Sequence, residues 1–191
     1  MLPKITVVTV VYNGILTLDA TIKSVISQTY SNLEYIVVDG GSTDGTLELL
    51  KKYNSQISII ISEKDDGLYD AMNKGIALST GEWICFMNCG DIFSSCNVLT
   101  FIFENNDWTK ADIIYGDAIQ IDGRRKKLIV AGYDLFQLNY HPIYRHNASF
   151  VRTQIHKHFL FDLSLRKKIN YALDFYICLL YTSPSPRDVE E

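Results

Sequence analysis

The stretch from Ile5 to Val11 constrains the fold of this chain more than any other. Every residue in it is β-branched and the run is unbroken, so a strand here presents branched side chains to both faces of a sheet. Strands covered on both faces occur mainly in parallel sheets that lie between two layers of helices. The run ends in Tyr12-Asn13-Gly14, a turn signal. The sequence therefore predicts a buried strand at the start of an α/β domain.

The segments that follow alternate between helix and strand patterns. Apolar residues with helical spacing come first, at Leu18, Ile22, Val25 and Ile26. Further helices are expected over Thr46–Lys52, with Asp44 or Ser42 as the N-cap, and over Leu68–Leu78. Further strands are expected over Tyr35–Val38, Ile57–Ile61, Trp83–Asn88 and Ile113–Tyr115. Such alternation implies right-handed crossovers, so the predicted fold class is α/β, with a mostly parallel sheet flanked by helices.

Composition and charge limit the function classes. The chain has 191 residues, 47% of them hydrophobic and 21% charged, which suits one globular domain. A net charge of −4 disfavours a general nucleic-acid binder, because such proteins usually carry a basic face. The one basic run, Arg124–Lys127, is short and is interpreted as a solvated hairpin. We find no signal peptide, no run of membrane-spanning length and no zinc-type cysteine spacing, so we expect a cytoplasmic protein with free thiols.

A carboxylate, Asp91, follows the predicted strand Trp83–Asn88 in the turn Asn88-Cys89-Gly90-Asp91. Open α/β sheets bind their ligands at the carboxyl ends of their strands, so Asp91 is placed to hold a hard cation against an anionic substrate. Aspartate is also a favoured N-cap, and the same residue could instead cap a following helix. The strand and the turn alone leave these two interpretations evenly balanced.

Two other predicted strands end in similar turns, Asp39-Gly40-Gly41 and Gly116-Asp117. In a parallel sheet these turns share an edge with Asp91. Glycines there expose backbone N–H groups to phosphate, whereas carboxylates repel phosphate unless a divalent cation bridges them. This combination favours a nucleotide-diphosphate site with Mg²⁺ or Mn²⁺. The sequence lacks both G-x-x-x-x-G-K-[ST] and a G-x-G-x-x-G after the first strand, which disfavours a P-loop ATPase and a dinucleotide-dependent dehydrogenase.

Six segments share an order and spacing that is far more specific than any one of them. They are Thr9–Asn13, Ser27–Tyr30, Val38–Thr46, Asp66–Gly75, Asn88–Asp91 and Tyr115–Asp117. Together they resemble the family 2 glycosyltransferases with the GT-A fold, of the bacterial polysaccharide-assembly type. The resemblance extends from residue 3 to about residue 177 and implies a Rossmann-like, mostly parallel sheet flanked by helices.

The resemblance assigns a donor-nucleotide pocket to the first two strand ends. Asp39 matches the family acid after the second strand, and the turn around Val11 and Tyr12 completes the pocket. Many family members carry a second acid after the first one, where this chain has Gly40.

The resemblance also assigns the metal site. Asp91 matches the last acid of the D-x-D-type motif, which holds the metal on the donor diphosphate. Asn88 replaces the leading acid and is expected to hydrogen-bond the donor ribose. With one strong ligand left, the cation is expected to take its other ligands from the diphosphate and water.

Asp174, within Tyr171–Phe175, matches the catalytic base that deprotonates the acceptor hydroxyl in a single inverting displacement. Without the resemblance it would be interpreted as a surface helix residue. His146 matches a family histidine followed by an amide and is expected to contact the diphosphate or to orient the acceptor, with a core or loop histidine as an equal alternative. Three other histidines are interpreted as surface residues: His141, His156 and His158.

Three further residues are assigned to donor binding. Asp70 and Asn73 lie three positions apart on the predicted helix Leu68–Leu78, so one face can present both to the donor pocket. The alternative for this pair is local capping and side-chain pairing. Asp117 ends a strand at the same edge and is expected to bind donor or acceptor sugar, or else to cap the turn toward Asp122-Gly123.

The resemblance implies transfer of a sugar from a nucleotide-diphosphate donor to a saccharide or lipid-linked acceptor in cell-surface polysaccharide synthesis. We expect a peripheral contact with the inner face of the cytoplasmic membrane and no nucleic-acid partner. The alternative is a non-catalytic nucleotide-sugar-binding module, suggested by the reduced set of acids. The transferase domain is expected over residues 1–177, truncated at its C-terminus. Residues 178–191 resemble a translated sequencing adapter, with an ordinary disordered tail as the alternative.

Overall fold

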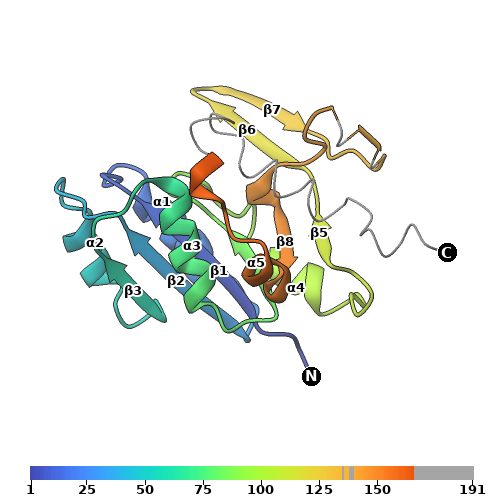
Figure 1. Ribbon diagram of the computed structural model, residues 1–191, viewed down its shortest axis with the longest axis horizontal. Helices are drawn as coiled ribbons and strands as arrows, with labels where there is room; N and C mark the ends of the chain where they lie inside the picture. The colour runs from blue at the N-terminus through green and yellow to red at the C-terminus, as the bar shows by residue number, and fades with distance from the viewer. Residues whose placement is uncertain (135, 138–139, 166–191) are drawn as a thin grey trace.

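Figure 1 shows a central β-sheet flanked by helices in the computed structural model, which describes residues 1–134, 136–137 and 140–165. The sheet has six strands in the order β3-β2-β1-β4-β8-β5. The strands are β1 Ile5–Val11, β2 Leu33–Asp39, β3 Ile59–Ser62, β4 Trp83–Phe86, β5 Ile113–Tyr115 and β8 Ser149–Arg152. β1 pairs in parallel with β2 and β4, and β2 with β3, whereas β8 pairs antiparallel with β4 and β5. The carboxyl ends of β1 to β4 therefore share one edge.

Helices cover both faces of the sheet. They are α1 Leu18–Ile26, α2 Thr46–Lys52, α3 Leu68–Leu78, α4 Val98–Phe103 and α5 Thr153–His158. β1 is buried along its whole length, and its alternate residues serve two separate cores. Val7 packs in the core that contains α1, α2 and α4, whereas Val8 packs in the core that contains α3 and Phe161. Among the residues that the structure describes, no helix has the length and apolarity needed to cross a bilayer.

The predicted α/β class with a mostly parallel sheet is confirmed. β1, α2, α3 and β5 have the predicted bounds. β4 ends at Phe86, earlier than predicted, because the chain turns between Asn88 and Asp91, although the Met87 N–H still donates to the Val8 carbonyl oxygen of β1 at 2.9 Å. β3 begins at Ile59 instead of Ile57. β8, which the sequence patterns do not indicate, enters antiparallel between β4 and β5.

The start of α2 also corrects a prediction. Its N-cap is Gly45, in a left-handed conformation with φ 98°, and neither Asp44 nor Ser42. The Asp44 carboxylate still contacts the helix, because it accepts hydrogen bonds from the N–H of Thr46 at 3.0 Å and from its hydroxyl at 2.6 Å. A carboxylate therefore stabilises the first turn from one position further out.

The basic run Arg124–Lys127 lies in a second, two-stranded sheet. Its strands are β6 Ala118–Asp122 and β7 Arg125–Ile129, which pair antiparallel. The run is exposed, which confirms its interpretation as a solvated hairpin. In Figure 1 this hairpin lies apart from the larger sheet, beyond the ends of β5 and β8.

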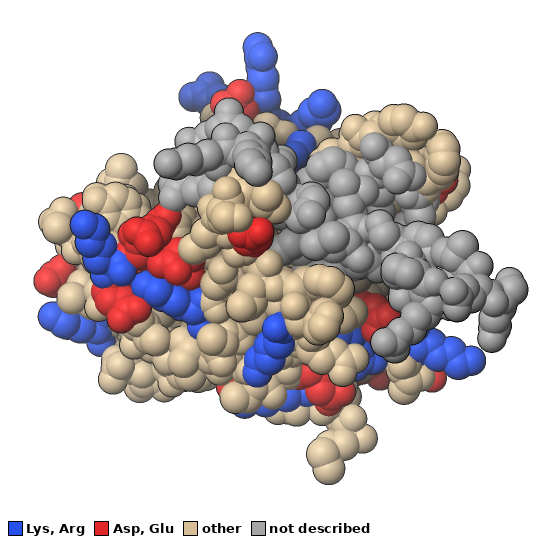
Figure 2. Space-filling view, in the orientation of Figure 1, with Lys and Arg blue, Asp and Glu red and all other residues tan. Residues whose placement is uncertain are grey.

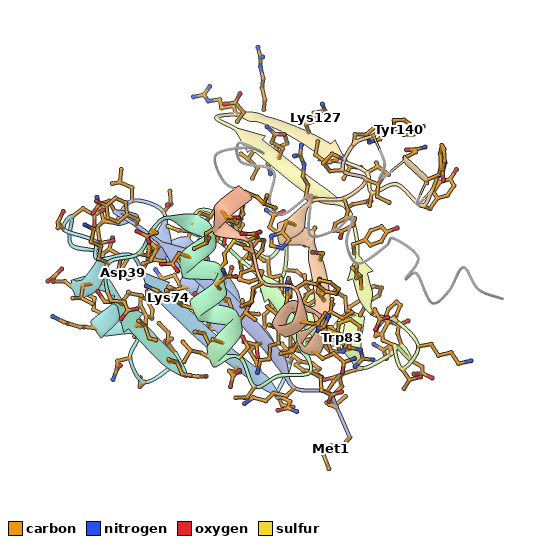
Figure 3. The ribbon with its side chains drawn as sticks, in the orientation of Figure 1. Met1, Asp39, Lys74, Trp83, Lys127 and Tyr140 are labelled. Carbon is orange, nitrogen blue, oxygen red and sulfur yellow. The ribbon has the colours of Figure 1, made fainter. Side chains whose placement is uncertain are left out.

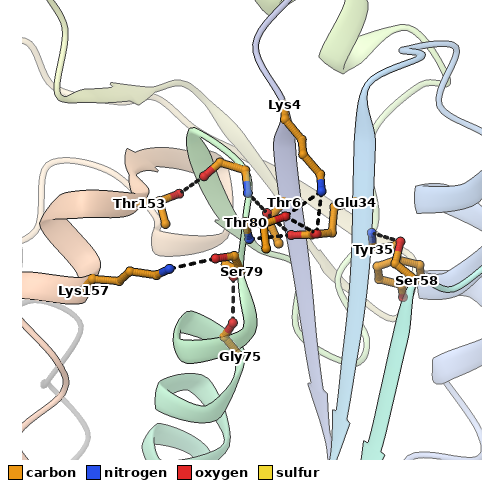
Figure 4. Close-up of polar contacts among 11 residues, drawn as sticks. Lys4, Thr6, Glu34, Tyr35, Ser58, Gly75, Ser79, Thr80, Thr153 and Lys157 are labelled. Atoms are coloured by element: carbon orange, nitrogen blue, oxygen red, sulfur yellow. Dashed lines mark hydrogen bonds and ion pairs between the residues drawn. The ribbon is translucent and has the colours of Figure 1, made fainter.

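A polar network around Glu34 closes the amino end of the sheet (Figure 4). The Glu34 carboxylate accepts hydrogen bonds from the Lys4 ammonium at 2.7 Å and the Thr6 hydroxyl at 2.6 Å. It also accepts from the N–H and the hydroxyl of Thr80, at 2.8 Å and 2.5 Å. Burial by itself raises the pKa of this carboxyl, but the hydrogen bonds outweigh burial and lower the pKa to about 2. Protein donors alone thus satisfy Glu34.

Candidate active site

Asp91 lies in a tight turn after β4. Gly90 has a φ of 101°, which glycine adopts without strain, and the Asp91 N–H donates back to the Asn88 carbonyl oxygen at 2.9 Å. The Gly90 N–H donates to the Thr21 hydroxyl of α1 at 3.0 Å, which ties the turn to that helix. The next helix, α4, begins only at Val98. The interpretation of Asp91 as a helix N-cap is therefore wrong.

Two polar side chains of this turn receive few hydrogen bonds from the described part of the protein. Burial raises the pKa of Asp91, and hydrogen bonds with the Asn147 side chain and the Asn88 backbone oppose the rise only in part. The Oδ1 atom of Asn88 is buried and has no hydrogen-bond partner among the described residues. Leaving a buried acceptor unpaired costs roughly 1–3 kcal/mol, so such an atom in a cavity indicates a place for a ligand.

A cavity of about 220 Å³ opens against the turn. Its apolar lining comes from one side of α3, from Leu68, Tyr69 and Met72. Its polar lining comes from the turn after β4 and from the segment before β8: Asn88, Asp91, Arg145, His146 and Asn147. The structure thus brings together three residues that were assigned to the site, Asn88, Asp91 and His146. It adds Arg145 and Asn147, which sequence reasoning missed as site residues.

His146 belongs to an aromatic cluster behind the cavity. Its ring stacks on Phe86 of β4, with 5.2 Å between centroids and 24° between planes. It meets His156 edge-on at 6.4 Å. His156 is only 1% exposed, so its interpretation as a surface residue is wrong. Burial, and then the nearby His146, lower the pKa of His156 to about 3, so this ring is neutral at physiological pH.

The turns after β1 and β2 are tied to each other. The Val11 carbonyl oxygen accepts a hydrogen bond from the Gly40 N–H at 2.9 Å, and the Asn13 N–H donates to the Ser42 hydroxyl at 2.7 Å. Val11 is buried, whereas Tyr12 is 66% exposed at the edge where parallel strands end. The two turns assigned to the nucleotide are therefore held together by hydrogen bonds, and the Tyr12 side chain is exposed beside them.

Asp39 is fully buried between these turns. Its carboxylate accepts hydrogen bonds from the Ser42 N–H at 3.1 Å and from the hydroxyls of Ser42 and Ser62. Beside it, a Cβ added to Gly40 would overlap the Asp65 carboxylate. The structure therefore places an acid next to Gly40 although the sequence has none there. Sequence reasoning missed Asp65, which directly precedes the segment that begins at residue 66.

Asp70 and Asn73 of α3 do not line the cavity. The Asp70 carboxylate accepts a hydrogen bond from the Asp66 N–H at 3.1 Å and lies 3.5 Å from the Lys74 ammonium. The Asn73 side chain makes two hydrogen bonds of 2.9 Å with the backbone of Phe161. The Asp70 contacts match the alternative of local capping and side-chain pairing, whereas Asn73 binds a segment 88 residues away in sequence. A donor role for either residue stays a prediction.

The remaining assigned residues lie elsewhere. The Asp117 carboxylate accepts a hydrogen bond from the Ala131 N–H at 2.8 Å, at the base of the β6–β7 hairpin, so it does not cap the turn at Asp122-Gly123. Asp174 and residues 178–191 lie outside the described residues. Within the described part of the chain, no three His, Cys, Asp or Glu side chains gather in a way that could hold a metal ion.

Sequence comparison identifies the family. A profile of glycosyl transferase family 2 matches residues 6–170. The chain belongs to glycosyl transferase family 2. This match confirms the resemblance drawn from the six sequence segments.

Two relatives of this family 2 chain illustrate the match. The PGL/p-HBAD biosynthesis glycosyltransferase of Mycobacterium bovis is 34% identical over 124 residues, which cover 61% of this chain and 47% of that protein. The cholesterol galactosyltransferase of Borreliella burgdorferi is 32% identical over 132 residues, covering 66% of this chain and 37% of that protein. The chain therefore spans half or less of the length of these curated relatives.

Solved structures show that this family 2 chain has the GT-A fold. Residues 1–349 of TarS from S. aureus superpose with a TM-score of 0.73 at 18% identity, over 92% of this chain and 54% of that one. The mannosyltransferase PcManGT from Pyrobaculum calidifontis gives a TM-score of 0.64 at 17% identity, over 85% and 48% of the two chains.

Proposed function

We propose that this chain binds a nucleotide-diphosphate sugar at the cavity beside Asp91 and moves the sugar, with inversion at the anomeric carbon, to an acceptor. The observation that carries the proposal is the pair Asn88 and Asp91. Asn88 Oδ1 is a buried acceptor with no donor in the described part of the chain, and Asp91 is a carboxylate that burial disfavours as an anion. A nucleotide diphosphate with a divalent cation supplies both a hydroxyl donor and positive charge.

The ligands of two solved neighbours support this donor class. TarS has been solved in complex with UDP and with UDP-GlcNAc. PcManGT has been solved in complex with GDP-Man and Mn²⁺. The donor proposed here is of the same chemical kind.

The proposed acceptor is a saccharide or a lipid-linked molecule, in cell-surface polysaccharide synthesis. One relative is named a cholesterol galactosyltransferase, which supports an acceptor of lipid character. We place the reaction at the inner face of the cytoplasmic membrane, where a peripheral protein would meet such an acceptor.

The residues of the turn fit a hard divalent cation, Mg²⁺ or Mn²⁺. Oxygen atoms are the ligands that these cations prefer, and Asp91 offers a carboxylate at the cavity wall. No cluster of three or more ligating side chains completes the shell within the described residues, which leaves coordination positions for diphosphate and water oxygens. When bound, the cation would offset the negative charge that develops on the departing diphosphate.

The other binding and catalytic roles are assigned to residues of the chain. Asp39, with Val11 and Tyr12, is assigned to the nucleotide, and Asn88 Oδ1 to a ribose hydroxyl. His146, fixed by its stack on Phe86, is assigned to the diphosphate or the acceptor. Asp174 is assigned to the removal of the acceptor proton.

The mechanistic test is the variant Asp174→Asn. It keeps the shape of the side chain but not its basicity, so donor binding should be unchanged while transfer falls by roughly 10²–10⁴-fold. Donor binding is measured by calorimetry with the nucleotide sugar, and transfer by product formation. Unchanged transfer would show that another group is the base. Retention of the anomeric configuration in the product, read by NMR, would contradict the single displacement.

A non-catalytic nucleotide-sugar-binding module is the second candidate. The observation that favours it is that Asp91 is the single carboxylate among the described residues that line the cavity. Turnover of the nucleotide sugar with and without Mn²⁺ separates the two functions. The transferase requires Mn²⁺-dependent release of the nucleoside diphosphate, whereas donor binding without any turnover would favour the module.

A further inference from the structure

The β6–β7 hairpin stands apart from the sheet that carries the site. Within the described part of the chain, its two strands form a sheet of their own and join no other strand. Nearly all of its residues are exposed, on both faces. A two-stranded hairpin is marginally stable by itself in water, so an element of this kind gains stability from a partner surface.

One face of the hairpin carries a row of apolar side chains. Ile119 lies opposite Leu128, and Ile121 lies opposite Lys126. Residues that oppose each other, or lie two apart on one strand, share a face. Ile119, Ile121 and Leu128 therefore form one row, the hairpin stripe, in which the three side chains are 55%, 56% and 58% exposed. Adjacent exposed aliphatic residues of this kind indicate an interaction surface.

Positive charge is concentrated at the turn end of the hairpin. Lys126 lies opposite Ile121 and shares the face of the stripe, whereas Arg125 and Lys127 alternate onto the other face. The four residues Arg124–Lys127 are all basic and all exposed. None of them forms an ion pair with any residue that the structure describes. Figure 2 shows Lys and Arg side chains projecting outward where Figure 1 places the hairpin. The chain as a whole has a net charge of −4, so this local charge opposes the overall sign.

We propose that the hairpin stripe, with Lys126 on the same face and Arg124 in the adjoining turn, docks on a lipid bilayer that carries anionic headgroups. The aliphatic side chains enter the boundary between headgroups and acyl chains, and the basic side chains contact headgroup phosphates. In Figure 3, Tyr140 lies on the same side of the molecule as Lys127. Tyr140 is 71% exposed, and tyrosine favours the membrane–water interface.

Charge and chemistry favour this partner over two others. A second copy of the hairpin would bring four cations against four like charges, which is unfavourable. The phosphates of a nucleic acid would neutralise the cations, but its remaining contacts are made through base edges and stacked aromatic rings, which leaves the aliphatic row in water. An anionic bilayer matches both the stripe and the charges. The proposal rests on the membrane contact proposed above and is independent of the donor chemistry.

The test is cosedimentation with phosphatidylcholine vesicles that contain or lack phosphatidylglycerol. The chain should bind only the anionic vesicles, and more weakly as salt rises. Arg124→Gln/Lys126→Gln should weaken this binding roughly 25-fold, because each basic residue near an anionic surface contributes about fivefold. The matched control is Lys51→Gln/Lys52→Gln on exposed positions of α2, which should bind like the wild type. Equal losses in the two double variants would overturn the proposal.

A second variant tests the stripe itself. Ile119→Ser/Leu128→Ser should weaken binding to the anionic vesicles by at least about tenfold, because two aliphatic side chains no longer leave water. Phe101→Ser on α4, where the native side chain is 73% exposed, is the control and should bind normally. If the stripe instead packs against protein, the serine variant has a lower free energy of unfolding in urea and the wild type does not bind vesicles. That result overturns the proposal. Both assays omit the donor, so their failure leaves the transfer chemistry untouched.

Discussion

Two carboxylates at opposite ends of the sheet show how the surroundings decide what an acid does. Glu34, at the amino end of β2, accepts hydrogen bonds from Lys4, Thr6 and Thr80, and its pKa is lowered to about 2 in spite of burial. Asp91, beyond the carboxyl end of β4, is half-buried, and this burial raises its pKa. The number of donors, more than the burial, separates the two residues.

The comparison distinguishes a structural acid from one that is poised for a ligand. The charge of Glu34 is satisfied by the protein, so it stabilises the fold and has little to offer another molecule. The charge of Asp91 is compensated only in part, and Asn88 Oδ1 beside it has no donor among the described residues. Substitutions at the two ends should therefore affect different properties of the protein.

The largest effect is expected from Asp91→Asn. A bound cation stabilises the transition state of transfer by several kcal/mol. Loss of its carboxylate ligand should therefore lower the rate of Mn²⁺-dependent transfer by roughly 10³-fold. The free energy of unfolding should stay the same or rise, because a desolvated charge is removed. Transfer assays and urea unfolding measure the two quantities. Glu48→Gln, at an exposed position of α2, is the control. A large loss of stability in Asp91→Asn would mean that this acid is structural after all.

Glu34→Gln should show the opposite pattern. It removes a charge that accepts several hydrogen bonds, so the free energy of unfolding should fall by about 2 kcal/mol while donor binding is unchanged. Glu104→Gln at an exposed site should change stability by less than about 0.5 kcal/mol.

The contribution of Glu34 to stability should also depend on pH. The folded pKa of about 2 lies below the ordinary glutamate pKa of 4.5, so the folded state favours the ionised form. The stabilisation is therefore fully present above about pH 4.5 and is lost as the pH falls through the folded value. In urea unfolding from pH 5 downward, the wild type and Glu34→Gln should converge. A constant gap would contradict the assignment.

A smaller effect is expected from Asn147→Ala. Asn147 hydrogen-bonds the Asp91 carboxylate and so orients the proposed metal ligand. Loss of such a supporting contact typically lowers metal affinity by roughly 10–100-fold. Titration with Mn²⁺ in the presence of UDP measures the change, with Asn54→Ala at an exposed position as the control. Equal affinities of the two variants would show that Asn147 does not support the site.

Local patterns were sufficient to predict much of the fold. The β-branched run of β1 and the helical spacing of apolar residues in α1 are strong one-dimensional signals, and both elements form at those residues. β8 carries no such signal, because Ser149–Arg152 is short and becomes a strand through pairing with Trp83 and Ile84 of β4 and with β5. Pairing between distant segments is not visible in a local pattern.

The site could be predicted only at the strand ends. Asn88 and Asp91 could be predicted as site residues because a glycine-containing turn follows an apolar run. His156 lies in a polar stretch and was misjudged, because its burial depends on packing against Phe86 from a distant strand. The contact between Asn147 and Asp91 likewise joins distant segments, and spacing gives no sign of it.

The central claim is that Asp91 holds a divalent cation on the diphosphate of a bound nucleotide. The most direct measurement is an anomalous difference map from crystals of the chain grown with Mn²⁺ and UDP. The account predicts one strong peak roughly 2.1 Å from an Asp91 carboxylate oxygen, with the diphosphate on its other side and a ribose hydroxyl donating to Asn88 Oδ1. UDP bound in the cavity with no Mn²⁺ at Asp91, or with Mn²⁺ held elsewhere, would contradict it.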